Sequence, residues 1–352
     1  MLAIFTFILF QNALLGFDFY ICGKRKKNMQ KEFSNYILEQ LEAQELQVIE
    51  QIQALWSGYG SIVRYRVIGG KVSTVIIKHI KPPLKENHPR GWNTNISHQR
   101  KLKSYQVESA WYQNYGEMAT AACRIPKCYG LIKKEEELCI LLEDLDALGF
   151  PVRLNQVSEK ELQNCIKWLA NFHATYLNQK AIGLWETGTY WHLETRPDEL
   201  DVLEDVDLKK NAKAIDALLK NSRFQTLVHG DAKLANFCFS EKGEVAAVDF
   251  QYVGGGVGMK DLAYFVGSCF YEEECESKEE EILNIYFKEL EKALQRNSSQ
   301  VVFKDLEKDW RALYPVAWAD FYRFLKGWSS GHWKINSYSE RICREVIEKI
   351  NG

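Results

Sequence analysis

The sequence lacks an excess of positive charge. It contains 45 Lys and Arg against 47 Asp and Glu, so its 352 residues carry a formal net charge of −2 at pH 7. Proteins that bind nucleic-acid polymers usually concentrate basic residues, because these residues neutralise the phosphate backbone. We therefore expect no nucleic-acid partner, whereas small molecules remain open as ligands.

The nine cysteines lack the spacing of a metal site. No CxxC pair occurs, and the two closest cysteines, Cys123 and Cys128, have no matching pair and no clustered histidine. Zinc sites that are recognisable from sequence need such paired spacings. We expect reduced and mostly buried thiols in a cytoplasmic protein.

Internal repeats, low-complexity tracts and long linkers are also absent from the sequence. Its residues are 46% hydrophobic and 26% charged, which is ordinary for a folded protein. A chain of this length is large enough to form two lobes around a cleft.

The amino-terminal segment is an exception to this ordinary composition. Residues 1–22 are mostly apolar and precede the basic run 24–27. One interpretation is a membrane anchor whose carboxyl side is held in the cytoplasm by these charges, although Asp18 weakens the span. The other is that residues 1–28 are an extension before a start at Met29, and we favour this second interpretation. Membrane contact is expected only if the segment is an anchor, and the order of apolar and basic residues disfavours a secretory signal.

Two parts of different character follow Met29. In residues 29–146, a helical pattern over 32–56 is followed by β-branched residues alternating with glycine-rich turns, as in a small antiparallel sheet. Residues 98–116 then predict a helix, and residues 137–142 predict a buried strand that leads into a polar connector at Glu143.

The pattern of residues 147–352 is mainly helical, beginning with apolar residues at helical spacing over 159–177. The sequence therefore predicts an α+β protein with a sheet-rich first lobe and a larger helical second lobe.

The stretch "LVHGDAKLANFCFSEKGEVAAVDFQ", residues 227–251, places polar side chains at the ends of short apolar runs. Residues 227–228 and 245–248 predict short buried strands, with turns at Gly230 and Gly243. Polar groups at strand ends are held rigidly above a core, so this stretch is the strongest candidate for a functional site.

The motifs "HGDAKLANF" and "VDFQ" resemble the catalytic loop and metal-binding segment of aminoglycoside phosphotransferases and choline kinases, and more distantly those of protein kinases. The order along the chain agrees: a glycine-containing turn, "VIIK", a helix with a Glu, a strand with a connector, then HxDxxxxN and DF. "LLEDL", "NFHA" and "DLAYF" most resemble the ecdysteroid-kinase-like branch of these small-molecule kinases. The resemblance implies a two-lobed protein-kinase-like fold and transfer of the γ-phosphoryl group of ATP to a hydroxyl of a small molecule.

Phosphoryl transfer needs charge neutralisation and alignment more than covalent help. In the roles that the resemblance implies, Asp231 orients the acceptor hydroxyl and accepts its proton. Asn236 and Asp249 supply oxygen ligands to Mg²⁺, as hard cations prefer.

The resemblance implies further contacts to ATP. Lys78 is expected to contact the α- and β-phosphates and to be held by an ion pair with Glu108. Lys233 matches a γ-phosphate-contacting lysine of protein kinases, and the connector at Glu143 is expected to contribute to the cofactor site.

Two other residues are expected to support the site structurally. His229 is predicted to hydrogen-bond the backbone near Asp249. The resemblance assigns Asp261 to bracing the catalytic-loop backbone, and the alternative is a helix N-cap, because Asp261 opens a helical pattern.

The sequence departs from the protein-kinase pattern in three places. Gly58 and Gly60 form the expected phosphate loop without a complete GxGxxG, and "GGKVST" is the competing loop. Gln251 stands where protein kinases have Gly, and no APE-like motif follows, which argues against a protein substrate. The alternative function is a catalytically silent kinase-like nucleotide-binding protein, but the joint presence of the expected site residues favours an enzyme.

The acceptor is expected to bind mainly to the helical lobe, which is rich in aromatic residues. Aromatic faces suit either a quaternary ammonium group or a flat apolar scaffold, whereas an aminoglycoside favours clustered carboxylates. The residues predicted to line this pocket are Tyr190, Trp191, His192, Asp320 and Tyr322.

Overall fold

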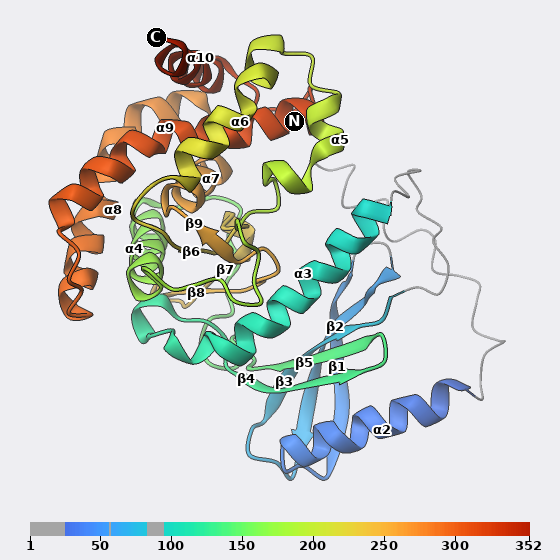
Figure 1. Cartoon of the computed structure of the whole chain (residues 1–352). Helices are drawn as coiled ribbons and strands as arrows, with labels where there is room; N and C mark the ends of the chain where they lie inside the picture. The colour runs from blue at the N-terminus through green and yellow to red at the C-terminus, as the bar shows by residue number, and fades with distance from the viewer. Residues whose placement is uncertain (1–24, 56–57, 83–94) are drawn as a thin grey trace.

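The computed structural model describes residues 25–55, 58–82 and 95–352, which form a sheet-based lobe and a larger helical lobe (Figure 1). The apolar segment 1–22 lies outside the described residues. The proposed start at Met29 lies inside helix α2, Arg25–Gln40. In the described part of the chain, no helix is both long and apolar enough to cross a lipid bilayer.

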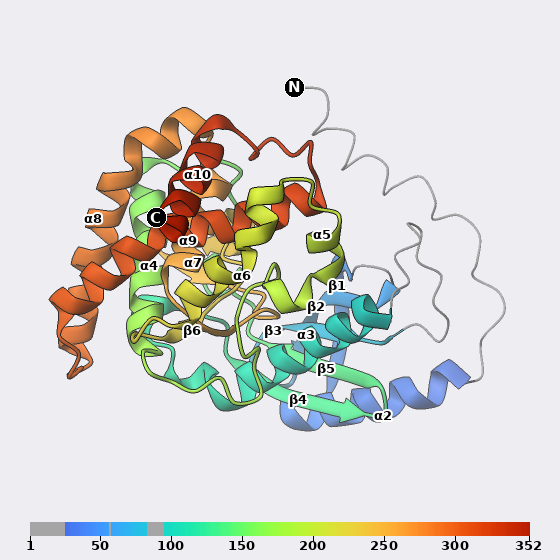
Figure 2. The ribbon, with the colours of Figure 1, turned by 45° about the horizontal axis from the view of Figure 1, so that its top comes forward.

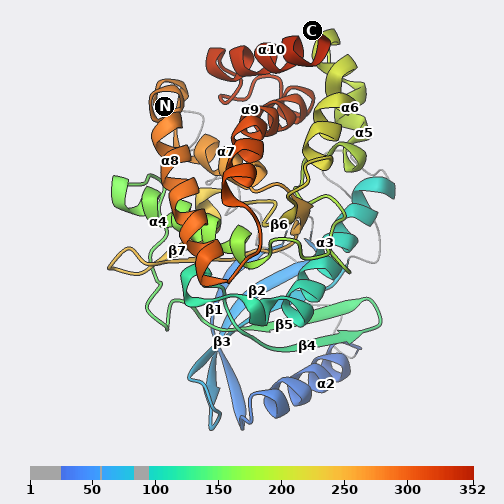
Figure 3. The ribbon, with the colours of Figure 1, turned by 60° about the vertical axis from the view of Figure 1, so that its left-hand side comes forward.

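The first lobe contains a five-stranded antiparallel sheet in the order β1-β2-β3-β5-β4. Its strands are β1 Glu45–Ala54, β2 Gly60–Ile68, β3 Thr74–Ile80, β4 Cys128–Lys134 and β5 Glu137–Leu142. Helix α2 covers one face, and α3, Asn95–Asn114, lies on the other face, between the sheet and the helical lobe (Figures 1 and 3).

Alternation along β3 determines which side chain meets which helix. Val75 and Ile77 are buried in the cluster that includes α2, whereas Ile80 is buried with residues of α3. Successive side chains of a strand point to opposite faces, so Lys78 shares the α3 side of the sheet with Ile80.

The helix expected over residues 32–56 is wrong in its second half. Helix α2 ends at Gln40, the chain turns at Glu42 with a φ of 48°, and β1 begins at Glu45. Strand β1 is the edge of the sheet, and most of its side chains are exposed. Its residues therefore show no clear buried face, and antiparallel pairing with the next strand, β2, decides the structure.

Long helices build the second lobe (Figures 1 and 2). They are α4 Glu159–Thr175, α6 Val206–Lys220, α7 Met259–Cys269, α8 Glu272–Arg296, α9 Phe303–Trp328 and α10 Ser337–Asn351, with the short α5 Pro197–Asp201. Helix α4 begins with a capping box in which Ser158 and Glu161 satisfy each other's backbone N–H groups. Helices α10 and α2 lie at opposite ends of the molecule (Figures 1 and 3).

Four short strands carry the central motif. They are β6 Thr226–Val228, β7 Phe237–Phe239, β8 Val245–Ala247 and β9 Gly254–Gly256, paired as β6 with β9 and β7 with β8. Two of them confirm the strands expected at residues 227–228 and 245–248. The molecule has the predicted α+β architecture, with a sheet-based first lobe and a larger helical second lobe.

Candidate active site between the lobes

Lys78 connects the two lobes through two carboxylates. Its Nζ lies 2.7 Å from Oε2 of Glu108 on α3 and 3.2 Å from Oδ1 of Asp249, which follows β8. Lys78 and Glu108 are buried, whereas Asp249 is partly exposed. The site therefore contains a buried ammonium beside one buried carboxylate and one accessible carboxylate.

The pKa shifts of Lys78 and Asp249 favour their ionised forms, whereas burial raises the pKa of Glu108. Burial alone would lower the pKa of Lys78, but Glu108 and Asp249 outweigh that effect and raise it. Burial alone would raise the pKa of Asp249, but the neighbouring Lys78, Lys233 and Lys101 lower it to about 2. Asp249 is therefore a carboxylate at neutral pH and suits a hard cation.

The loop after β6 is held by a buried carboxylate. Oδ2 of Asp261 accepts the backbone N–H of His229 at 2.5 Å, and its Oδ1 accepts that of Gly230 at 2.9 Å. The cap position of α7 is Gly258, so Asp261 lies inside the first helical turn and is not the N-cap. His173 also contacts Asp261, at 3.1 Å, which fixes the carboxylate from a second element.

His229 links the loop to the strand that precedes Asp249. Its Nε2 lies 3.1 Å from the carbonyl oxygen of Val248, and its Nδ1 accepts the backbone N–H of Asp231 at 3.3 Å. Gly230 has a φ of 78°, and a Cβ there would lie 2.1 Å from the carbonyl oxygen of Tyr252. Backbone conformation and space both require glycine beside Asp231.

Three donors surround the Asp231 carboxylate. Oδ2 accepts Nζ of Lys233 at 2.9 Å and Nδ2 of Asn236 at 3.1 Å, and Oδ1 accepts the hydroxyl of Tyr264 at 3.2 Å. Asp231 is nine-tenths or more buried. The carboxylate is thus fixed in orientation.

The β7–β8 hairpin brings Asn236 and Asp249 to the same end. Asn236 immediately precedes β7, Asp249 lies just beyond β8, and the backbone N–H of Val248 donates to the carbonyl of Asn236 at 3.0 Å. Nδ2 of Asn236 donates to Asp231, so its Oδ1 is the free acceptor and takes no hydrogen bond from the described residues. An amide oxygen and an ionised carboxylate at one hairpin end fit a Mg²⁺ ligand set.

The turn between β1 and β2 lies at the Lys78 end of the sheet. Gly60 begins β2 opposite Ile80, and a Cβ on Gly60 would lie 1.9 Å from the carbonyl oxygen of His79, with a φ of 132°. A Cβ on Gly58 would meet nothing within 4 Å. The competing turn at residues 69–74 joins the opposite ends of β2 and β3 and packs against Leu41, so the β1–β2 turn is the better phosphate-loop candidate.

The Glu143 side chain is engaged within the protein. Its Oε2 forms an ion pair with Arg124 and accepts the backbone N–H of Lys127 at 3.1 Å. The carboxylate predicted to contribute to the cofactor site therefore holds the connector in place.

The residues predicted to line the acceptor pocket lie in different surroundings: Tyr322 borders a cavity of the helical lobe beside Phe321, Trp333 and Lys334, whereas Trp191, His192 and Asp320 do not border that cavity. Only Tyr190 is partly exposed, whereas the other four side chains are at most 3% exposed: Trp191, His192, Asp320 and Tyr322. Trp191 donates to Asp320 at 3.1 Å, and Asp320 pairs with the buried cations Lys260 and Arg323. Trp191 and Asp320 therefore belong to a buried charge network, which the sequence around them does not reveal.

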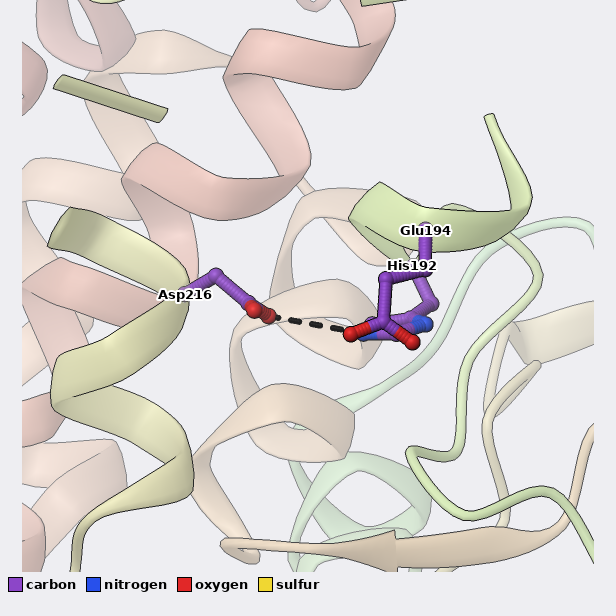
Figure 4. Close-up of side chains that lie close together, drawn as sticks. All are labelled: His192, Glu194 and Asp216. Atoms are coloured by element: carbon purple, nitrogen blue, oxygen red, sulfur yellow. Dashed lines mark ion pairs between the residues drawn. The ribbon is translucent and has the colours of Figure 1, made fainter. Parts of the chain in front are cut away.

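His192 belongs to an ion-pair cluster on the helical lobe (Figure 4). His192, Glu194 and Asp216 place potential metal-ligand atoms within 4.8 Å of one another, and Nε2 of His192 lies 3.5 Å from Oδ1 of Asp216. Lys220 already pairs with both carboxylates, at 2.8 Å from Glu194 and 3.1 Å from Asp216. The cluster thus contains its own cation and is better explained as structural.

Sequence reasoning missed two side chains at the site. Nζ of Lys101 lies 4.9 Å from the ring centroid of Tyr105 and 3.4 Å from Oε1 of Gln251. Burial lowers the pKa of Lys101 to about 8, against the opposing charge of Asp249. Lys101 is seven residues before Glu108, so both lie on one face of the helix. This spacing could have predicted Lys101 at the site. The other missed residue is Tyr264, which contacts Asp231 from α7 and stands in the "DLAYF" motif.

Residues 92–182 and 189–298, more than half of the chain, match the ecdysteroid kinase-like family. The matched residues include Glu108, Asp231, Asn236 and Asp249. No curated protein sequence matches the chain.

Three solved structures illustrate the similarity to known folds. Amicoumacin kinase hAmiN in complex with AMP-PNP, Ca²⁺ and Ami is 15% identical, with 93% of this chain and 95% of that chain covered and a TM-score of 0.44. Choline kinase LicA from Streptococcus pneumoniae is 14% identical, with 92% and 99% covered and a TM-score of 0.40. The streptomycin-ATP-APH(2")-IIa ternary complex is 14% identical, with 88% and 97% covered and a TM-score of 0.45. At these identities and TM-scores the resemblance is distant, and no property of those proteins is assigned to this chain from it.

Proposed function

Because the chain belongs to the ecdysteroid kinase-like family, we propose that it transfers the γ-phosphoryl group of ATP to a hydroxyl of a small molecule. The observation that carries the proposal is the contact of Lys78 with both Glu108 and Asp249, next to the fixed carboxylate of Asp231. These groups supply the lysine, metal ligand and acceptor-side carboxylate that phosphoryl transfer requires.

Asn236 and Asp249 are the residues that would hold Mg²⁺. The free amide oxygen of Asn236 and the lowered pKa of Asp249 support this assignment, because Mg²⁺ prefers oxygen ligands and needs an ionised carboxylate. What a bound Mg²⁺ supplies is neutralisation of the phosphate charge.

Lys78 binds and orients the phosphates of ATP. Its ammonium is held by Glu108 at a fixed place on β3, so little side-chain freedom is lost when it contacts a phosphate. The β1–β2 turn with Gly58 is the proposed phosphate loop. Lys233 is the proposed γ-phosphate contact, because its Nζ lies 2.9 Å from the Asp231 carboxylate.

Asp231 orients the acceptor hydroxyl and accepts its proton. Each carboxylate oxygen has two lone pairs, and Oδ1 accepts only the Tyr264 hydroxyl among the described residues. One acceptor position on Oδ1 is therefore open to the substrate O–H, while Lys233 and Asn236 keep the carboxylate from rotating.

The test is transfer of label from γ-³²P-ATP to a panel of hydroxyl acceptors: sterols, choline, ethanolamine, aminoglycosides and sugars. We expect a phosphorylated product with one acceptor class, and we expect chelation of Mg²⁺ to abolish it. Tight Mg²⁺-dependent ATP binding without product on any class would contradict the proposal and favour a catalytically silent nucleotide-binding protein.

A further inference from the structure

Three aromatic rings form a cage on the helical side of Asp231. They are Tyr264 on α7, Phe321 on α9 and Trp333 in the segment between α9 and α10, and we call this group the aromatic cage. Tyr264 and Phe321 are in contact, with their ring centroids 5.0 Å apart. The Tyr264 hydroxyl also donates to Asp231, so the cage directly adjoins the proposed catalytic carboxylate.

The cage is occupied by a side chain of the protein itself. Nζ of Lys334 lies 5.3 Å from the ring centroid of Tyr264, 5.5 Å from that of Phe321 and 5.4 Å from that of Trp333. The described residues include no acidic group in ion-pair contact with this ammonium. Its recorded partners are therefore the three aromatic rings.

The segment that carries Lys334 is ordered by local contacts. Its backbone N–H donates to Nδ1 of His332 at 3.2 Å, and the rings of His332 and Trp333 stack with centroids 5.8 Å apart. Burial lowers the pKa of Lys334 to about 8, which is consistent with an ammonium enclosed by rings and still largely protonated at neutral pH.

A cage of aromatic faces is the usual protein receptor for a quaternary ammonium group, because the ring faces attract a desolvated cation. In this chain the place of such a ligand is already taken by an ammonium of the protein. A cationic acceptor approaching Asp231 would therefore gain no ring contacts there and would meet a like charge.

We propose that Lys334 is a specificity residue which fills the aromatic cage and excludes quaternary ammonium and other cationic acceptors. This inference rests on the proposed function and deepens it, since it restricts the hydroxyl acceptor to molecules without a positive charge near the reacting group. Occupancy of the cage is the cause of the exclusion, and the positive charge reinforces it.

The test is binding of choline and of tetramethylammonium to the full chain by isothermal titration calorimetry without nucleotide. Wild type is expected to bind neither in the millimolar range. Lys334→Ala empties the cage and is expected to bind both with affinity higher by roughly tenfold or more. Lys334→Met refills the cage with an uncharged chain of similar length and is expected to gain much less affinity than Lys334→Ala.

Two controls separate cation recognition from general loosening. The uncharged choline isostere 3,3-dimethylbutanol is expected to gain less affinity than choline in Lys334→Ala, because ring faces attract the charge. Adding Trp333→Ala to Lys334→Ala removes one ring and is expected to reduce the gain. Unchanged circular dichroism of each variant establishes that it folds.

Three results would overturn the inference: wild type that binds choline as tightly as Lys334→Ala, a folded Lys334→Ala that gains no affinity, or Lys334→Met that gains as much as Lys334→Ala.

These results do not depend on turnover. If Lys334→Ala gains choline binding but no acceptor is phosphorylated, the inference stands and the proposed function fails. If wild type phosphorylates an uncharged acceptor and Lys334→Ala gains nothing, the inference alone fails.

Discussion

On the proposed nucleotide side of the site, Lys78 contacts both Glu108 and Asp249, whereas on the proposed acceptor side the Lys334 ammonium contacts three aromatic rings and no acidic group among the described residues. The first group combines opposite charges whose geometry follows from strand alternation and a hairpin. The second depends on a segment between two helices. We infer that the Lys78 group performs the part of the reaction that does not depend on the acceptor, whereas Lys334 and its rings determine which acceptor binds.

Asp249→Ala is expected to cause the largest loss of activity and of Mg²⁺-dependent ATP binding. Losing a metal ligand removes an interaction worth several kcal/mol in the transition state, so kcat/KM should fall by about 10³-fold or more. Mg²⁺-dependent ATP binding, measured by calorimetry, should fall with it.

The matched control is Glu241→Ala, because Glu241 is an exposed acid at the opposite end of the same hairpin. We expect it to leave both quantities unchanged. Normal Mg²⁺-ATP affinity in Asp249→Ala would remove Asp249 from the metal site.

Lys78→Met tests the other charged member of the nucleotide side. Losing one preorganised charge from the phosphates should lower kcat/KM by about 10²- to 10³-fold. The variant also leaves the buried Glu108 without its partner, so circular dichroism must establish that it folds. Steady-state kinetics checks this, with the exposed Lys71→Met as control. Equal activity of the two variants would show that Lys78 does not contact phosphate.

Asp261→Ala tests the support beneath the catalytic loop. It leaves the buried N–H groups of His229 and Gly230 without their acceptor, so the free energy of unfolding should fall by about 3 kcal/mol. Urea denaturation measures the loss, and Asp198→Ala, an exposed acid on α5, is the control. Equal stability of the two variants would contradict the bracing role.

Asp216→Asn tests the ion-pair cluster of His192, Asp216 and Lys220, which we expect to stabilise the fold and to take no part in the reaction. Burial alone would raise the pKa of Asp216, but His192 and Lys220 lower it from 3.8 to about 2. A carboxyl group whose pKa is lower in the folded than in the unfolded protein stabilises the fold at pH values above its unfolded pKa. This contribution is lost as the pH falls from about 4 to about 2.

Asp216→Asn should therefore cost about 2 kcal/mol of unfolding free energy at pH 7, and less as the pH falls through that window. Urea denaturation across this pH range measures the difference, and turnover at low temperature should be close to wild type. A constant difference at all pH values would show that the Asp216 charge does not stabilise the fold.

The two sides also differ in how far the sequence predicts them. Asp231, Asn236 and Asp249 lie within twenty residues, and short strands with one turn bring them together, so motif spacing was sufficient. Glu108 and Lys78 followed from the order of the elements. By contrast, Trp191, His192 and Asp320 were predicted to line the acceptor pocket but are buried in polar contacts, because the sequence pattern does not show which side of an element meets solvent.

Other features depended on pairing and packing between elements. Strand β1 forms because β2 pairs with it, although its own pattern favoured a helix. The aromatic cage joins residues of α7 and α9 with the segment after α9, and its occupant was not predictable without their packing.

The most direct measurement of the central claim compares turnover and nucleotide binding in wild type and Asp231→Asn with an active acceptor. Since Asp231 faces the acceptor hydroxyl in this account, turnover should fall by about 10²- to 10⁴-fold while Mg²⁺-ATP affinity stays within about twofold. Turnover within tenfold of wild type, or loss of ATP affinity in parallel with turnover, would contradict the assignment of Asp231 as the acceptor-side base.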